Sequence, residues 1–273
     1  MILKDFFGRS LAKLKDKKLF LFDMDGTIYL DNQLFEGVDT LFKQIKANGG
    51  RYVFITNNSS RSIGDYVEKL QRLGLDYIEE GDFYTSSQVS IDLMKHKFGN
   101  DLIYAQGTRS FIKQLRDSGL SITEEYNENA VAVLVGFDDE ITGQKLRTTC
   151  KMLTLHDVPY YATNPDWVCP VDFGYVPDCG SMCFGIEKAT GKTPIFIGKP
   201  QPQMIYSAME KFCATEEETI VIGDRIYTDI ASGVNAGVDT ILVLSGETTI
   251  DDYNKSEIKP KYVLDHVKQL IED

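Results

Sequence analysis

The stretch LFLFDMDGT at residues 19–27 decides the fold. Its four apolar residues are typical of a β-strand that is buried on both faces, as in a parallel sheet. Two carboxylates, Asp23 and Asp25, follow directly and point to the same side of an extended chain end. Like charges this close need a cation between them or a shifted pKa. Alone, the stretch also fits a solvated Asp-x-Asp-Gly turn, which is common.

Strands and helices alternate outward from this stretch. Apolar residues recur at helical spacing over 38–45, and a second buried strand follows at 52–55. Such alternation indicates a parallel sheet with helices on both faces. Strands of this sheet are expected at residues 19–22, 52–55, 83–84, 195–197, 219–222, 240–244 and 262–264. We therefore predict an α/β fold with a Rossmann-like, doubly wound core.

The middle of the chain repeats the alternation with different content, with strands expected at 102–105, 130–135 and 160–162. It ends in an irregular stretch, 165–180, that holds three prolines and Trp167. A long Pro-rich loop inside a compact protein is usually functional. We predict one domain formed by residues 1–84 and 179–273, interrupted by a second α/β domain at 85–178.

Composition excludes several classes of protein. The 273 residues carry a formal net charge of −12, which disfavours binding to nucleic acid or to an anionic membrane. The longest apolar run, 130–135, is far shorter than the roughly 20 residues of a membrane helix. Charged residues interrupt any signal peptide, and residues 3–14 read instead as an amphipathic helix docked on its own domain. Five cysteines without an export signal indicate free thiols and a cytoplasmic protein.

Two more motifs follow predicted strands. One offers neutral polar side chains and the other a lysine. Thr56, Asn57 and Asn58 offer short polar side chains ahead of a helix, which suits an oxyanion, although an ordinary helix cap reads the same way. Lys199, held between Gly198 and a proline, is a fixed cation at a helix start. Open α/β sheets place their sites at such strand ends.

The motif GDRIYTD at residues 223–229 adds two more acids at a strand end, Asp224 and Asp229. Several carboxylates without histidine or cysteine select a hard cation such as Mg²⁺. An acid nucleophile, a second acid, a lysine and Mg²⁺ together describe phosphoryl transfer through an aspartyl-phosphate.

The chain resembles the phosphatases of the haloacid dehalogenase (HAD) superfamily, subfamily IIA, the branch of NagD and the 4-nitrophenylphosphatases. The motifs match in order over nearly the whole chain: residues 23–27, 56–58, 162–166, 198–200, 223–229 and 242–246. The resemblance implies that the inserted domain is a C2-type cap. One departure is Asp178-Cys179, where relatives often carry smaller residues; it leaves the substrate contacts of the cap open.

The resemblance also implies roles for the acids. Asp23 would be the nucleophile, and Asp25 the general acid to the leaving alcohol and then the base for water. Mg²⁺ would bind Asp23, the main-chain carbonyl of Asp25, and Asp224. Asp229, with Gly223 beside it, would orient the lysine or a metal-bound water.

It implies a substrate site as well, for a small phosphomonoester. The phosphoryl oxygens would be held by Thr56, Asn57 and Lys199, of which Thr56 and Lys199 also count as catalytic residues. Asn58 would be a further substrate-binding residue. The leaving group would lie near Asn164, Asp166 and Trp167, although a lone aromatic residue near a loop is more often a core residue of its domain.

Rival functions remain. A dehalogenase would not need Asp25 as an acid, no second phosphate site marks a phosphomutase, and a silent binding module would be expected to have lost Asp23 or Asp25. Relatives often pair through their caps, so a homodimer is one alternative for the oligomeric state.

Overall fold

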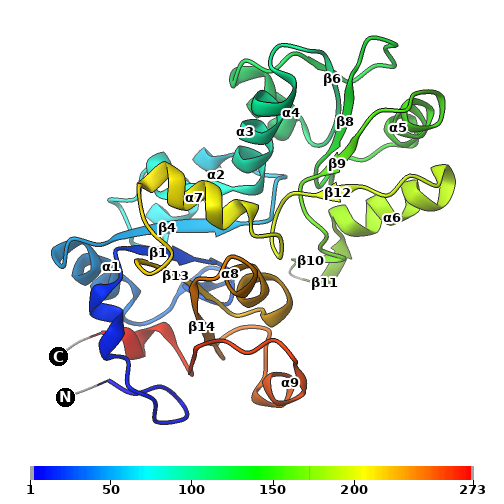
Figure 1. Cartoon of the computed structure of the whole chain (residues 1–273). Coiled ribbons are helices and arrows are strands. Elements are labelled where there is room, and N and C mark those ends of the chain that lie inside the picture. Colours follow the sequence, from blue (N-terminus) through cyan, green and yellow to red (C-terminus); the bar gives the residue numbers. More distant parts are fainter. Residues whose placement is uncertain (1–2, 172, 272–273) are drawn as a thin grey trace. The chain divides into compact units, whose positions relative to one another are not determined.

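The computed structural model describes residues 3–171 and 173–271, so the outer ends of the expected domains, at 1 and 273, lie outside it. The chain divides into two compact units (Figure 1). The first consists of Met1–Thr56, Gly64–Tyr84 and Lys199–Asp273, and the second of Asn57–Ile63 and Thr85–Gly198.

The first unit is built on a six-stranded sheet in the order β15-β14-β13-β1-β4-β5. The strands are β1 (Leu19–Phe22), β4 (Arg51–Thr56), β5 (Phe83–Thr85), β13 (Thr219–Gly223), β14 (Asp239–Val243) and β15 (Tyr262–Leu264). Pairing is parallel from β15 to β4. Since the chain winds outward from β1 in both directions, the predicted doubly wound sheet is confirmed.

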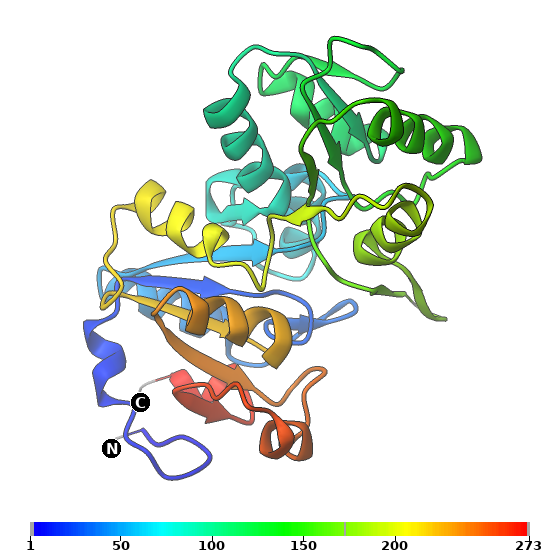
Figure 2. The same ribbon diagram turned by 45° about the vertical axis from the view of Figure 1, so that its right-hand side comes forward.

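Helices cover both faces of this sheet. They are α1 (Val38–Ala47), α2 (Ile63–Arg72), α7 (Gln203–Phe212), α8 (Ala231–Asn235) and α9 (Ile250–Lys255). Figures 1 and 2 show α8 in front of the strands in both views. Right-handed crossovers that run in opposite directions put their helices on opposite faces, so α1 covers the other face. Its buried residues recur at the predicted helical spacing, and Phe42 stacks on Tyr52 of β4 with ring centroids 4.5 Å apart.

Short elements complete the first unit. They are the 3₁₀ turns η1 (Ala12–Asp16), η2 (Glu80–Asp82) and η4 (Val267–Leu270), the π-helical turn η3 (Ile226–Ile230), and a hairpin of β2 (Tyr29–Leu30) and β3 (Gln33–Leu34).

The second unit has a parallel five-stranded sheet in the order β12-β9-β8-β6-β7. Its strands are β6 (Ile103–Gln106), β7 (Ile122–Thr123), β8 (Ala132–Val135), β9 (Tyr160–Ala162) and β12 (Ile195–Phe196). Its helices are α3 (Ser86–Phe98), α4 (Arg109–Asp117), α5 (Gly143–Leu155) and α6 (Cys179–Thr190).

The unit boundary differs from the expected one. Residues 179–198, predicted to belong to the first domain, lie in the second unit, as does the segment Asn57–Ile63. The physical reason is that β12 pairs with β9, and that α6 buries Cys179, Cys183 and Ile186 in the core of the second unit.

The Pro-rich stretch is more regular than expected. Val168–Val171 (β10) and Gly174–Pro177 (β11) form an antiparallel hairpin rather than an irregular loop. Both strands of a two-stranded hairpin are edge strands, where a proline removes no essential ladder hydrogen bond.

The prediction of an amphipathic helix over residues 3–14 is wrong. Lys4 and Ser10 form an antiparallel bridge, so residues 4–10 fold back on themselves. The carboxylate of Asp5 accepts hydrogen bonds from the backbone N–H groups of Phe7 and Arg9, and Gly8 has a φ of +78°. These local hydrogen bonds engage backbone N–H groups that a helix would need, and they prevent a helix from forming here.

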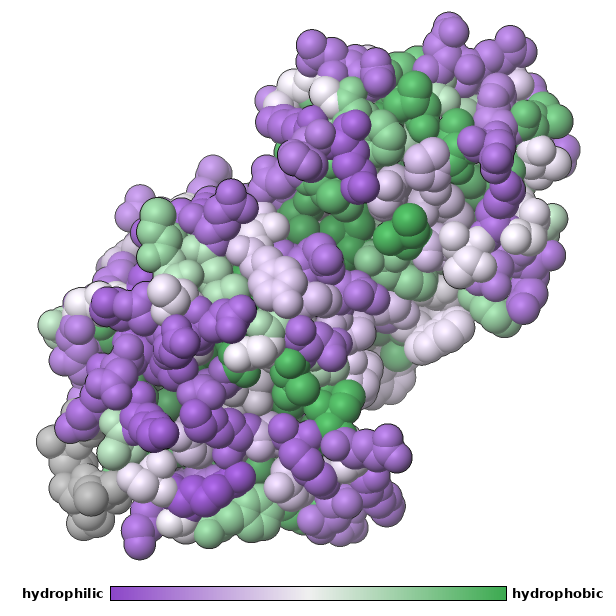
Figure 3. Space-filling model, in the orientation of Figure 1, coloured by the Kyte–Doolittle hydropathy of each residue, from purple (hydrophilic) through white to green (hydrophobic). Residues whose placement is uncertain are grey.

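The surface seen in Figure 3 is mostly hydrophilic, with hydrophobic residues exposed in patches. Within the described residues, no helix has the length and apolar character needed to cross a bilayer. The described cysteines, Cys150, Cys169, Cys179, Cys183 and Cys213, form no disulfide in the structure.

Candidate active site

The carboxyl ends of neighbouring strands carry the predicted acids of the first unit. Phe22, the last residue of β1, pairs with Phe54 of β4 and Ile222 of β13. Asp23 comes directly after β1, and Asp224 directly after β13. Because parallel strands end at the same edge of the sheet, the two aspartates become neighbours.

Three carboxylates and one ammonium group meet at this edge. Asp23, Asp224 and Asp229 each offer a carboxylate oxygen within 4.8 Å of the others. The Nζ atom of Lys199, a buried side chain, lies 2.7 Å from Oδ1 of Asp23 and 2.6 Å from Oδ1 of Asp229. It also donates to the carbonyl of Ile55 at 3.3 Å. The lysine is therefore held at a fixed point beside Asp23.

Both carboxylate oxygens of Asp229 accept hydrogen bonds. Its Oδ2 accepts a hydrogen bond of 3.1 Å from the backbone N–H of Arg225, while Oδ1 contacts Lys199. The π-helical turn η3 carries Asp229 back towards the strand end, and a Cβ on Gly223 would lie 2.3 Å from that of Asp229. This geometry favours a positioning role, in which Asp229 orients Lys199.

Two glycines allow the backbone to approach Asp224. An ideal Cβ on Gly26 would lie 2.5 Å from Oδ2 of Asp224, and one on Gly246 only 2.1 Å away. Gly26 also adopts a left-handed φ of +78°, which favours glycine. A side chain at either position would displace Asp224.

The chemistry of Asp224 fits a divalent cation. Its Oδ2 accepts a hydrogen bond of 2.7 Å from the backbone N–H of Glu247. Its Oδ1 is buried and, among the residues that the structure describes, has no hydrogen-bond partner. A buried carboxylate oxygen without a partner is costly, and a cation would satisfy it. Oxygen ligands alone suit Mg²⁺ or Ca²⁺.

Burial and crowding shift the pKa values of these groups. Burial, followed by the charge of Asp229, raises the pKa of Asp23 to about 7, against the opposing effect of Lys199. Burial, then the charges of Asp23 and Asp229, raise the pKa of Asp224 to about 8. Burial alone would lower the pKa of Lys199, but the two carboxylates outweigh it and raise that pKa. The excess negative charge is what a bound cation would neutralise.

Two further predicted residues of the first unit, Asp25 and Thr56, lie at the ends of the paired strands β1 and β4. Asp25 is exposed on the loop after β1, and partial desolvation raises the pKa of its carboxyl, opposed by Lys69 and Arg225. A raised pKa suits a group that must donate a proton. Thr56 is buried at the end of β4.

The residues predicted around the leaving group come together within the second unit, largely by bonding one another. Oδ2 of Asp166 accepts hydrogen bonds from Asn57 Nδ2 at 2.7 Å and from Asn164 Nδ2 at 2.8 Å. Asn164 has no exposed surface and also donates to Asp178 Oδ1 at 3.0 Å. This geometry favours an internal role for Asn164, which holds Asp166 in place.

Trp167 and Asn58 lie outside this buried network. Trp167 is 59% exposed and packs edge-to-face on Phe184, with ring centroids 5.6 Å apart. It is therefore no core residue. Asn58 Oδ1 accepts a hydrogen bond of 2.9 Å from the backbone N–H of Ser60, which shapes the turn after β4.

Two contributors were not assigned a role from the sequence. Asp178 caps α6 and binds Asn164. An aspartate directly before a helix is the signal for such a cap, but the sequence predicts an irregular stretch up to residue 180. The sequence marks Gly246 only as part of a motif, because its approach to Asp224 depends on the tertiary fold.

Comparisons with known proteins identify the class. Residues 20–121 match a family model described as haloacid dehalogenase-like hydrolase, and residues 196–270 match a HAD-hydrolase-like model. Ribonucleotide monophosphatase NagD of Escherichia coli is 32% identical over 248 residues, which cover 91% of this chain and 96% of NagD. The chain belongs to the haloacid dehalogenase superfamily.

Solved structures narrow the assignment. A 4-nitrophenylphosphatase from Thermotoga maritima is 39% identical, with a TM-score of 0.89, and the match covers 94% of this chain and 97% of that one. A glycerol phosphate phosphatase from Mycobacterium tuberculosis in complex with magnesium is 26% identical, with a TM-score of 0.88, over 96% of this chain and 78% of that one. The protein is a phosphatase of the NagD-like branch, an α/β enzyme with a C2-type cap, and phosphatases of this class use a divalent cation.

Proposed function

We propose that this enzyme hydrolyses small phosphomonoesters with Mg²⁺, through a phosphoryl group carried on Asp23. The observation that supports this most strongly is the arrangement around Asp23. Lys199 is fixed on one side of its carboxylate, and Asp224 offers a carboxylate oxygen within 4.8 Å of one on Asp23. The Oδ1 atom of Asp224 is buried and has no hydrogen-bond partner among the described residues. As a nucleophile, Asp23 would therefore have one fixed cation beside it, the ammonium group of Lys199, and a site for a second cation, a metal ion.

In the first step, a carboxylate oxygen of Asp23 attacks phosphorus, and the bond from phosphorus to the leaving oxygen breaks. Asp25 gives its proton to that oxygen. Its raised pKa favours the protonated form that this step needs. The products are an aspartyl-phosphate and the free alcohol.

In the second step, the carboxylate of Asp25 takes a proton from water, and the water oxygen attacks phosphorus. The bond between phosphorus and Asp23 then breaks, which releases inorganic phosphate and restores both acids. Lys199 and Thr56 would hold phosphoryl oxygens during both steps, and Asp229 would keep the lysine in position.

Mg²⁺ would be held by Asp23, the main-chain carbonyl of Asp25, and Asp224, and it would neutralise charge on the phosphoryl oxygens. The carboxylate Oδ1 of Asp224 fits this role because nothing else in the described structure satisfies it. We propose Mg²⁺, rather than another divalent cation, as the metal of this enzyme. We also propose that Asn57, Asn58, Asp166 and Trp167 contact the substrate. Pairing of two copies through the cap stays a prediction.

The test is hydrolysis of nitrophenyl phosphate with Mg²⁺ and with EDTA. We expect turnover that needs Mg²⁺ and is abolished in Asp23→Asn. Asp251→Asn, an exposed aspartate on α9, is the matched control and should keep full activity. Undiminished turnover in EDTA, or an active Asp23→Asn variant, would refute the proposal.

A further inference from the structure

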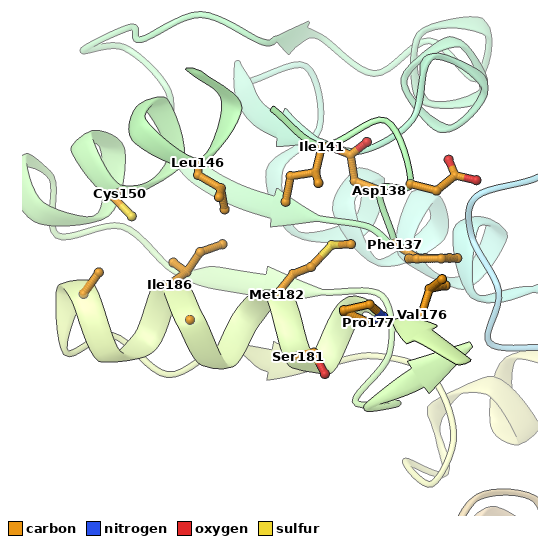
Figure 4. A pocket seen from close by; sticks show the side chains of 13 residues that line it. Phe137, Asp138, Ile141, Leu146, Cys150, Val176, Pro177, Ser181, Met182 and Ile186 are labelled. Atoms are coloured by element: carbon orange, nitrogen blue, oxygen red, sulfur yellow. The ribbon is translucent and has the colours of Figure 1, made fainter. Parts of the chain in front are cut away.

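An apolar groove of about 730 Å³ lies within the second unit, between α5 and α6. Figure 4 shows Leu146 and Cys150 of α5 pointing towards Met182 and Ile186 of α6, with Phe137 closing one end. None of these residues belongs to the acid cluster at Asp23. We call this feature the α5–α6 groove.

The sequence of α6 keeps the groove open. Gly185 lines it in the middle of the helix, where glycine costs about 1 kcal/mol relative to alanine. A Cβ at Gly185 would meet no atom within 4 Å, and Ala189, one turn later, also lines the groove. Small residues here leave space that larger apolar side chains could have filled.

Charge is confined to one end of the groove. The buried carboxylate of Asp138 is neutralised by Lys145, whose Nζ lies 3.0 Å from both of its oxygens. The next residue, Asp139, also lines the groove and is exposed. Within residues 3–171 and 173–271, no ion pair involves Asp139, so this end carries a surplus negative charge.

Size and charge together define the occupant. A volume of about 730 Å³ lies in the range of small-molecule pockets, roughly 300–1,000 Å³. An anionic amphiphile would meet Asp139 and a chain of net charge −12. We propose that the α5–α6 groove binds a small molecule with an apolar body and a positively charged end, the body between Leu146 and Ile186 and the charge beside Asp139.

The probes are three naphthalenes that differ only in their polar end: naphthylmethylamine, naphthoate and naphthalenemethanol. We expect saturable binding of the amine to the full chain by equilibrium dialysis, weaker binding of the alcohol, and the weakest for naphthoate. Gly185→Leu should fill the groove and weaken amine binding about tenfold or more. Gly143→Leu, at another glycine with open space around its Cβ, is the matched control and should bind like the wild type.

A second measurement uses the unmodified protein. The amine should slow alkylation of Cys150, which lines the groove, and leave the rate at the exposed Cys213 unchanged. Absence of saturable amine binding, or equal binding to a folded Gly185→Leu variant, would overturn the site. Naphthoate binding as tight as that of the amine would overturn the assigned charge of the ligand. Phosphatase activity enters none of these readouts, so they stand apart from the proposed function.

Discussion

Replacing Gly246 by alanine tests whether the position of Asp224 controls catalysis. The new Cβ would lie 2.1 Å from Oδ2 of Asp224, and ordinary contact begins near 3.4 Å. The carboxylate must therefore move by about 1.3 Å, the difference between the two distances. Misplacement of about 1 Å at a reacting centre can cost on the order of 10²-fold in rate. We expect a loss of that size in kcat/KM and a higher Mg²⁺ requirement.

The assay is initial-rate hydrolysis of nitrophenyl phosphate over a range of Mg²⁺ concentrations, with a melting curve for each variant. Overpacking should cost about 1–3 kcal/mol in the free energy of unfolding, so the variant should still fold. Gly143→Ala, whose Cβ meets open space, is the control and should match the wild type in rate. A folded Gly246→Ala enzyme with wild-type kcat/KM at limiting Mg²⁺ would refute the reasoning.

Asp25→Asn should lower kcat/KM by about 10²–10⁴-fold on an alkyl phosphate but less on nitrophenyl phosphate, whose leaving group needs little protonation; equal losses on both would show that the acid role is misassigned. Ca²⁺ should inhibit the Mg²⁺ enzyme, because it accepts more oxygens than the octahedron of Mg²⁺ and can engage both oxygens of the nucleophile; full activity with Ca²⁺ alone would count against this. Trp167→Ala should change the ranking of kcat/KM among phosphate esters while the melting temperature stays nearly constant, because the ring is 59% exposed; unchanged ranking would argue against substrate contact. In EDTA, melting temperature should fall as pH rises from about 4 to about 8, because the raised pKa values of Asp23 and Asp224 let the folded state bind more protons than the unfolded chain. Mg²⁺ or Asp224→Asn should reduce that slope, and a slope unaffected by either would contradict the assignment.

Much of the fold can be predicted because local pattern and tertiary structure agree. The run at 19–22 forms β1 with all four residues buried, and the helical spacing over 38–45 forms α1. Asp23 and Asp224 can be predicted for the same reason, since each directly follows a buried strand whose end faces the same edge of the sheet.

What could not be predicted depends on contacts between distant residues. Nothing local to residues 195–196 tells that β12 pairs with β9 rather than joining the sheet of the first unit. The bond between Asn164 and Asp178 likewise exists only once α6 starts at Cys179. At the N-terminus, apolar spacing favoured a helix, and the side-chain bonds of Asp5 override it.

The central claim is that Asp23 carries the phosphoryl group. The most direct test is mass spectrometry of the peptide containing Asp23 after rapid acid quench of Asp25→Asn with nitrophenyl phosphate. In that variant the first step needs little acid, while the second lacks its base, so the intermediate should accumulate. The account predicts a phosphorylated Asp23 that is absent from Asp23→Asn. A phosphoryl group on another residue, or an unmodified Asp23 during a burst of nitrophenol, would contradict it.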